Sequence, residues 1–280
     1  MDYKEQLKII QASSAWNRMQ GILLIVPTEL DQRDLVSSRL SHTLEVMEIG
    51  EQVADVFSLD VEMVRLIGAV HDIAHLPYGH YSEQVIACKL FPCKGLSVNH
   101  NENGPEIYAS LVGHKNVDTA VVCGIREHRS VDRFHSTLES WAVAHADEIA
   151  TLISDIRDGL SLPTNGGSHL DECEVVLALE GTILAGKAID EWARILITQL
   201  ILDKNNCRIS WNRVLGEVFT KLNELRAKVH SHPWVKAEEL QIVDRLRICF
   251  QSKEQEGFTP QEVIHSFLLH ATEPDMFQFV

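Results

Sequence analysis

The segment HDIAHLPYGHYSE, residues 71–83, contains three histidines and two acidic side chains around a Pro-Tyr-Gly break. It follows an apolar stretch with helical periodicity, so we expect His71 and Asp72 to end a helix, with His75 one turn later on the same face. Burying an adjacent imidazole and carboxylate costs several kcal/mol unless a partner compensates, and a divalent cation is one such partner. The alternative is a polar helix end that reaches solvent.

Two other segments carry side chains of the same kinds. In RLSHTLEV, Arg39 and His42 are three residues apart and share a helix face. In AHADEIATLISDIRDGL, Asp147, Thr151 and Asp155 follow one another at four-residue spacing among apolar neighbours. We therefore expect Asp147 to be buried and paired, although a lone histidine or acid on a helix face usually has no ligand role.

Together the three segments supply a mixed set of nitrogen and oxygen donors. His42, His71, Asp72 and Asp147 give two imidazoles and two carboxylates. This set suits Mn²⁺, Fe²⁺ or Mg²⁺ better than a structural zinc ion, which prefers thiolates. It also leaves coordination positions for water and a phosphate oxygen.

The order His42, His71-Asp72, Asp147 is similar to that of the HD-domain metal phosphohydrolases. More narrowly, three segments resemble motifs of the deoxynucleoside triphosphate (dNTP) triphosphohydrolases of the bacterial dGTPase type: RLSHTLEV, HDIAHLPYGHYSE and ADEIATLISDIRDGL. The segment IIQASSAWNRMQG resembles the one that precedes the first histidine in that family. The matching motifs run from about residue 9 to 160, and LRAKVHSHPWV shows a weaker likeness.

The resemblance implies a mainly helical fold with a metal between helices. It implies hydrolysis of a dNTP to the deoxynucleoside and inorganic triphosphate. On this interpretation His42, His71, Asp72 and Asp147 hold one Mn²⁺ or Mg²⁺, or Fe²⁺ or another transition metal. The ion binds an α-phosphate oxygen and lowers the barrier to attack by water at that phosphorus.

The resemblance also assigns catalytic residues. His80 and Glu83 match the catalytic histidine and its carboxylate partner, at a three-residue spacing that lets the acid orient the imidazole. His75 matches another active-site histidine, interpreted as a phosphate contact. His100, which we place in a loop formed by NHNENG, matches a phosphate-facing or catalytic histidine.

Substrate-binding positions follow in the same way. Arg39 matches a triphosphate-binding arginine, a bidentate donor that suits phosphate oxygens. Gln20 and Asp155 match positions near the deoxyribose. The chain departs from the family at Thr151, where the family usually has a tyrosine whose ring stacks under the sugar and crowds out a 2′-hydroxyl. This departure leaves open whether the chain discriminates against ribonucleotides and whether it makes the sugar contact at all.

A second metal is the alternative suggested by IREHRSVDRFH. His128 and His135 are similar in position to histidines that bind a second ion in two-metal members of the wider superfamily. Arg126, Arg129 and Arg133 surround them and would repel a second cation. We therefore predict a one-metal site with a basic rim for the triphosphate.

The composition limits the class of partner. With 280 residues and a net charge of −15, the chain repels polyanions at long range, which argues against nucleic acid and requires a cation for a small anionic substrate. The six cysteines form no CxxC pair, which favours reduced thiols in a cytosolic protein. Because the N-terminus lacks the apolar core of a signal peptide and no apolar run is long enough to span a bilayer, we predict a cytoplasmic protein.

Apolar residues recur at three- and four-residue spacing through most of the chain, so the predicted class is all-α, an HD-domain helical fold with additional C-terminal helices. Breaks are expected at residues 26–34, 76–79, 92–105 and 160–172. We predict an HD-type core over 1–160, a loop over 161–172, and a helical part over 173–280 that completes the same domain. The resemblance further implies a homo-oligomer.

Two other functions stay open at this point. One is a nucleotide phosphatase of the HD type that attacks a terminal phosphate. The other is an inactive nucleotide-binding regulator built on the HD fold, against which the complete ligand set and the His80 and Glu83 pair argue, because a binder needs neither.

Overall fold

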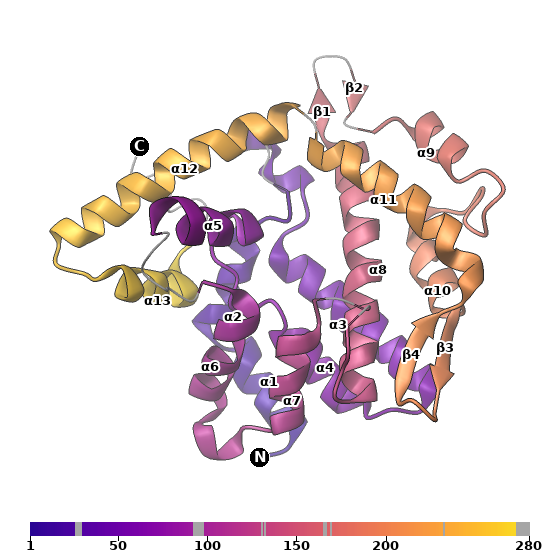
Figure 1. Cartoon of the computed structure of the whole chain (residues 1–280), viewed down its shortest axis with the longest axis horizontal. Coiled ribbons are helices and arrows are strands. Elements are labelled where there is room, and N and C mark those ends of the chain that lie inside the picture. The colour runs from indigo at the N-terminus through magenta and orange to yellow at the C-terminus, as the bar shows by residue number, and fades with distance from the viewer. Residues whose placement is uncertain are drawn as a thin grey trace.

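The computed structural model describes residues 1–25, 30–91, 98–129, 131, 133–164, 167–168, 170–231 and 233–272. Helices dominate these residues, which confirms the predicted all-α class (Figure 1). None of the described helices is both long and apolar enough to cross a bilayer. Cys93 lies outside the described residues, and the other five cysteines are free thiols, as expected.

The first part of the chain forms eight of the α-helices that the structure describes. They are α1 (Tyr3–Gln11), α2 (Ser14–Arg18), α3 (Arg39–Phe57), α4 (Val61–Val70), α5 (Gly79–Val85), α6 (His100–Val112), α7 (Thr119–Glu127) and α8 (Leu138–Ser161). A π-helical turn, Ile86–Leu90, continues α5.

The second part adds helices and two short antiparallel hairpins. They are β1 (Pro163–Thr164), β2 (Gly167–Ser168), α9 (Glu172–Ala178), α10 (Trp192–Ile197), β3 (Leu200–Asp203), β4 (Arg208–Trp211), α11 (Gly216–Ser231), α12 (Pro233–Gln255) and α13 (Pro260–His270). The segment 161–172, predicted as a loop, thus contains the β1–β2 hairpin between the end of α8 and the start of α9.

Helices α3, α4 and α8 pack against one another and form the centre of the core. The N-cap residue before each helix accepts a hydrogen bond from a backbone N–H of the first turn. These residues are Ser38 for α3, Asp60 for α4 and Thr137 for α8. Most of their apolar residues are buried, as expected from the helical spacing, although Leu44 and Val56 of α3 are exposed. The three elements that carry the predicted metal ligands are therefore held side by side.

The break at 76–79 turns the chain sharply. Tyr78 (φ 66°) and Gly79 (φ 54°) both have positive φ, a conformation that glycine adopts freely and tyrosine does not. A Cβ on Gly79 would lie 2.7 Å from the Arg39 guanidinium, so both backbone freedom and space require glycine here. Helix α5 starts at this turn, which directs His80 and Glu83 back toward the ends of α3 and α4.

Part of the predicted break over 92–105 is wrong. Residues 92–97 lie outside the described residues, but helix α6 begins at His100 and includes Pro105. The Asn99 side chain accepts a hydrogen bond from the Asn101 N–H and caps the helix. A run rich in asparagine and glycine thus serves here as a helix start.

The later helices cover the cavity side of the core. Helix α11 packs along α8, and α12 lies across α5 and joins α13 (Figure 1). In this arrangement the last turns of α11 lie against the part of α8 that carries Asp155 and Gly159.

A buried acid near the end of α8 links it to the segment before α3. The Ser37 N–H and hydroxyl donate to the two carboxylate oxygens of Asp158, at 3.0 and 2.8 Å. Burial, reinforced by the charge of Asp155, raises the pKa of Asp158 to about 7 despite these two bonds. Because an unfolded aspartate has a pKa near 3.9, ionisation of Asp158 opposes folding as pH rises between about 4 and 7.

Asp158→Asn should therefore stabilise the protein relative to wild type, with a gain that grows by at most about 1.4 kcal/mol per pH unit from pH 5 to 7 and then levels off. Thermal melting at pH 5, 6, 7 and 8 measures this gain. Asp190→Asn, at an exposed position, is the matched control and should show no such trend. A difference in melting temperature that is equal at pH 5 and pH 8 would rule out titration of Asp158.

Candidate functional site

The four predicted metal ligands come together where α3, α4 and α8 meet. His42 Nε2 lies 3.0 Å from Asp147 Oδ1 and 3.9 Å from Asp72 Oδ2. His71 Nε2 lies 3.6 Å from Asp72 Oδ2 and 3.9 Å from Asp147 Oδ1. Both imidazoles and Asp72 are buried. The atoms form the compact set of two nitrogens and two carboxylates that the spacing predicted.

His71 shows that this set suits a cation. Its Nδ1–H donates to the Gly68 carbonyl at 2.6 Å, which leaves the Nε2 lone pair directed at the carboxylates. That Nε2 is buried and has no hydrogen-bond partner. A buried acceptor next to two carboxylates needs a positive partner, and a divalent cation would supply it.

Asp72 is the centre of the cluster. Arg39 donates to Asp72 Oδ2 at 2.7 Å, and His75 Nε2 lies 3.1 Å from Oδ1. Burial raises the pKa of the Asp72 carboxyl, but His71, His75 and Arg39 outweigh it and hold that pKa well below its usual range. Asp72 is therefore an ionised carboxylate. Its Oδ2 faces His42 and His71, and its Oδ1 faces His75, one turn later.

Glu83 gathers three imidazoles around one carboxylate. His75 Nδ1 lies 2.8 Å and His100 Nδ1 3.1 Å from Oε1, and His80 Nδ1 lies 3.5 Å from Oε2. Burial raises the pKa of Glu83, but the histidines lower it far below its usual range. Of the three imidazoles, His100 has hydrogen-bond geometry to Glu83 through its Nδ1.

His80 is the exposed member of this group. Its side chain is 51% exposed, whereas the other two imidazoles are buried. Partial burial, together with the charges of His75 and Arg39, lowers the pKa of His80, and Glu83 opposes this shift. A neutral imidazole that is held by a carboxylate and open to a cavity can accept or donate a proton.

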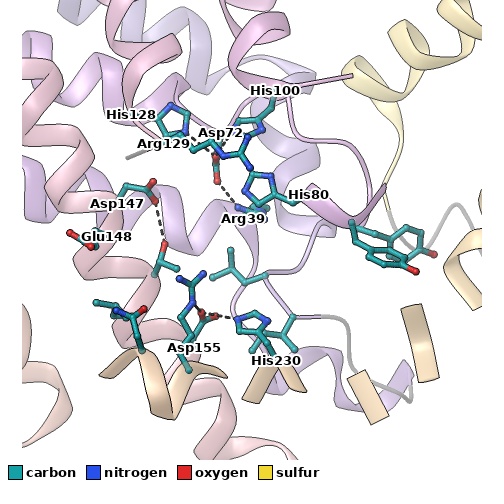
Figure 2. A pocket seen from close by; sticks show the side chains of 18 of the residues that line it. Arg39, Asp72, His80, His100, His128, Arg129, Asp147, Glu148, Asp155 and His230 are labelled. Atoms are coloured by element: carbon teal, nitrogen blue, oxygen red, sulfur yellow. Dashed lines mark hydrogen bonds and ion pairs between the residues drawn. The ribbon is translucent and has the colours of Figure 1, made fainter. Parts of the chain in front are cut away.

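A cavity of about 560 Å³ connects these groups to a second polar cluster. At its far end, Arg226 Nε donates to Asp155 Oδ2 at 2.5 Å and His230 Nε2 lies 2.9 Å from the same oxygen (Figure 2). Asp155 is two turns beyond Asp147 on α8, about 12 Å along the helix axis. The cavity is therefore long enough to hold a phosphate at one end and a sugar at the other.

Comparison with known proteins agrees with this geometry. Residues 39–152, which run from α3 to the middle of α8, match the family model described as HD domain. The matched part of the chain is therefore similar to HD domains. The match supports a metal-dependent phosphohydrolase.

Curated relatives confirm the predicted resemblance. Two of them are named deoxyguanosinetriphosphate triphosphohydrolase-like protein. The one from Thiobacillus denitrificans is 28% identical over 200 residues, covering 61% of this chain and 52% of the relative. The one from Geobacter metallireducens is 31% identical over 160 residues, covering 51% of this chain and 40% of the relative. The chain thus spans about half the length of these relatives.

The fold also has a counterpart among solved structures. A hypothetical protein from Aquifex aeolicus superposes with a TM-score of 0.60 at 15% sequence identity. The match covers 98% of this chain and 66% of that one. At this identity the likeness concerns the fold alone.

The structure places three of the predicted site residues differently from what the sequence suggested. His75 is fully buried between Asp72 and Glu83 and is not among the residues that line the cavity, so its phosphate contact stays a prediction. His100 is not in a loop but begins α6, where it is buried and stacks on His75 with ring centroids 3.7 Å apart. Gln20 is exposed outside the cavity, whose wall near the start of the chain is instead Leu24 and Ile25.

Arg39, Thr151 and Asp155 do line the cavity. The Thr151 hydroxyl donates to Asp147 Oδ1 at 3.3 Å, so it also touches a predicted metal ligand. Burial raises the pKa of Asp155, but His230 and Arg226 lower it overall. Asp155 therefore stays ionised at this end of the cavity.

His128 belongs to the cluster, although we assigned it no role. Its Nδ1–H donates to the Ile125 carbonyl at 2.8 Å, and its Nε2 lies 3.8 Å from Asp72 Oδ1. Burial lowers the pKa of His128 to about 3, so the ring is neutral. His135 packs on Trp141 instead, away from the cavity, while Arg129 contributes to the cavity wall.

The sequence also gives no role to Arg226 and His230 of α11, which contact Asp155 in the cavity. Their only sequence signal is the likeness in LRAKVHSHPWV.

Proposed function

We propose that this protein hydrolyses deoxynucleoside triphosphates to the deoxynucleoside and inorganic triphosphate. One observation carries the proposal: His80, which contacts Glu83, lines the same cavity as Asp72 and Asp147 of the set His42, His71, Asp72 and Asp147. The names of the curated relatives, which refer to deoxyguanosine triphosphate, add support for the substrate class.

In this proposal His42, His71, Asp72 and Asp147 hold one divalent cation. Mn²⁺ or Mg²⁺ fits their nitrogen and oxygen donors, and Fe²⁺ or another transition metal is compatible. When bound, the cation polarises a phosphate oxygen and makes water a better nucleophile. The two anions of the set thereby gain the positive partner that their burial requires.

The remaining residues bind substrate and move protons. Arg39 and Arg129 donate to phosphate oxygens from the cavity wall. Asp155, held by Arg226 and His230, accepts a hydrogen bond from a sugar hydroxyl. His80 donates a proton to the leaving oxygen or takes one from water, and Glu83 fixes the tautomer of its ring. His75 and His100 hold Glu83 in place.

Identification of the phosphorus product tests the proposal. The purified protein is incubated with each dNTP and each ribonucleoside triphosphate (NTP), with Mn²⁺ or Mg²⁺, and the products are separated by ion exchange. Tripolyphosphate with free nucleoside is the expected result. Orthophosphate alone would support the nucleotide phosphatase, and tight binding without turnover would support the regulator. Sedimentation of the same sample tests the predicted homo-oligomer.

Thr151 makes a separate prediction about the sugar. Threonine is too small to stack under a ribose and exclude its 2′-hydroxyl. We therefore expect an NTP to be hydrolysed within about tenfold of the corresponding dNTP, below the roughly 10–200-fold that one steric contact of about 1–3 kcal/mol provides. Thr151→Tyr should lower NTP turnover and spare dNTP turnover. Thr151→Val, which keeps the volume and removes the hydroxyl, is the control. Strong dNTP selectivity in wild type would contradict this expectation.

A further inference from the structure

The carboxylate of Glu83 and three imidazoles form a second donor set beside the first. One ligand atom from each of His75, His80, Glu83 and His100 lies within 4.8 Å of every other. The set differs in chemistry from His42, His71, Asp72 and Asp147, because it has three nitrogens and a single carboxylate. Figure 2 shows His80 and His100 next to each other at the edge of the cavity.

His75 provides an independent sign that this set is incomplete. It is fully buried, and neither ring nitrogen has a hydrogen-bond partner, although Nδ1 lies only 2.8 Å from Glu83 Oε1. Buried imidazole nitrogens are normally satisfied. A nitrogen and an oxygen that lie close together without hydrogen-bond geometry are expected when both atoms bind the same ion.

We propose that His75, His80, Glu83 and His100 bind a second cation, and that the site prefers Zn²⁺ to Mn²⁺ or Mg²⁺. Imidazole is a good ligand for zinc and a poor one for magnesium, and affinity for nitrogen-rich sites rises from Mn²⁺ to Zn²⁺. Zinc takes four ligands at about 2.0–2.2 Å, so the four side chains need to move together by only a small amount. His80, half exposed, gives the ion access from the cavity.

The site has a consequence that rests on the proposed function. The same His80 and Glu83 side chains serve proton transfer, and neither can do so while it binds zinc. Excess Zn²⁺ therefore inhibits hydrolysis even when the first site is filled, and inhibition follows occupancy of the second site.

A competing position for a second ion lies nearby. Asp72, His100 and His128 also offer three ligand atoms close together. The two positions share His100 but differ in His80 and His128, so variants of these two residues separate them.

Zinc binding to the full-length protein tests the proposal without any substrate. After equilibrium dialysis against Zn²⁺, elemental analysis should give two ions per chain for wild type. His80→Ala and Glu83→Gln should each bind the second ion at least tenfold more weakly and keep the first. His128→Ala should keep two ions, as should His265→Ala, an exposed control on α13. Co²⁺ in place of Zn²⁺ should give the visible absorption of a tetrahedral nitrogen-rich site that His80→Ala removes.

Three results would overturn the proposal. One ion per chain in wild type would show that the set binds no cation. Two ions in both His80→Ala and Glu83→Gln, with one in His128→Ala, would place the second ion at Asp72. Loss of an ion from His265→Ala would reveal surface binding. Because these results concern binding alone, they are distinct from a failure to release tripolyphosphate, which would contradict the proposed function.

Discussion

Asp72→Ala is expected to abolish both Mn²⁺ binding and turnover. One carboxylate oxygen of Asp72 is close to His42, His71 and Arg39, and the other is close to His75. Its loss removes one of two carboxylates that offset the charge of a divalent cation. Removing a mere hydrogen-bond partner of a metal ligand costs about 10–100-fold in affinity, so removing the ligand should cost more. Isothermal titration with Mn²⁺ and a tripolyphosphate assay measure the two effects.

Stability has to be measured alongside, because Asp72→Ala leaves the buried Arg39 guanidinium without its carboxylate. Asp72→Asn keeps the side-chain shape and a hydrogen-bond acceptor for Arg39, and should also lose the metal. Asp55→Ala, at an exposed position on α3, is the matched control and should bind and turn over as wild type does. If a folded Asp72→Asn variant still bound one Mn²⁺ with unchanged affinity, Asp72 would not be a ligand.

The sequence predicted the ligand set because the signal was local and periodic. His42 lies on a regular amphipathic helix, the pair at 71–72 ends one, and Asp147 sits among apolar residues on a third. Three buried helices that each carry a polar residue must bring these residues together or leave them unpaired in the core. The helical class followed from the same periodicity.

Contacts between distant segments could not be predicted in this way. Arg226 and His230 reach Asp155 from more than 70 positions along the chain, on a helix whose pattern reads as ordinary amphipathic structure. The sequence argues against a metal-binding role for His128 because Arg126, Arg129 and Arg133 flank it. In the structure Arg126 and Arg133 are exposed, and the His128 ring is turned inward to the cluster. Neighbours in sequence are poor evidence of charge around a side chain at a helix end.

His75 and His100 illustrate a related limit. Both are expected to face phosphate; they stack on each other beside Glu83, and of the two only His100 lines the cavity. The spacing along HDIAHLPYGHYSE predicts that His75 lies on the same face of the chain as His71. The contact of His75 with Asp72 is consistent with this prediction. The positive φ values at Tyr78 and Gly79 set the direction in which α5 leaves the turn, and residue spacing does not predict them.

His80→Ala is expected to separate metal binding from catalysis. The His80 ring is half exposed and lies outside the first ligand set, so its removal should leave Mn²⁺ affinity and melting temperature near wild type. Turnover should fall about a hundredfold or more, since general acid–base help usually contributes 10²–10⁴-fold. Steady-state assays at saturating Mn²⁺, with substrate varied, should show this loss in kcat more than in KM.

Glu83→Gln provides the second half of the test. Glutamine keeps the volume and one acceptor for the surrounding imidazoles but removes the charge that fixes the His80 ring. We expect a smaller loss of kcat than in His80→Ala, and little additional loss when the two changes are combined, because Glu83 acts through His80. Ser110→Ala, on α6 and away from the cavity, should not change the rate. A His80→Ala rate within a few fold of wild type would remove His80 from the catalytic step and leave the proton to another group on the cavity wall.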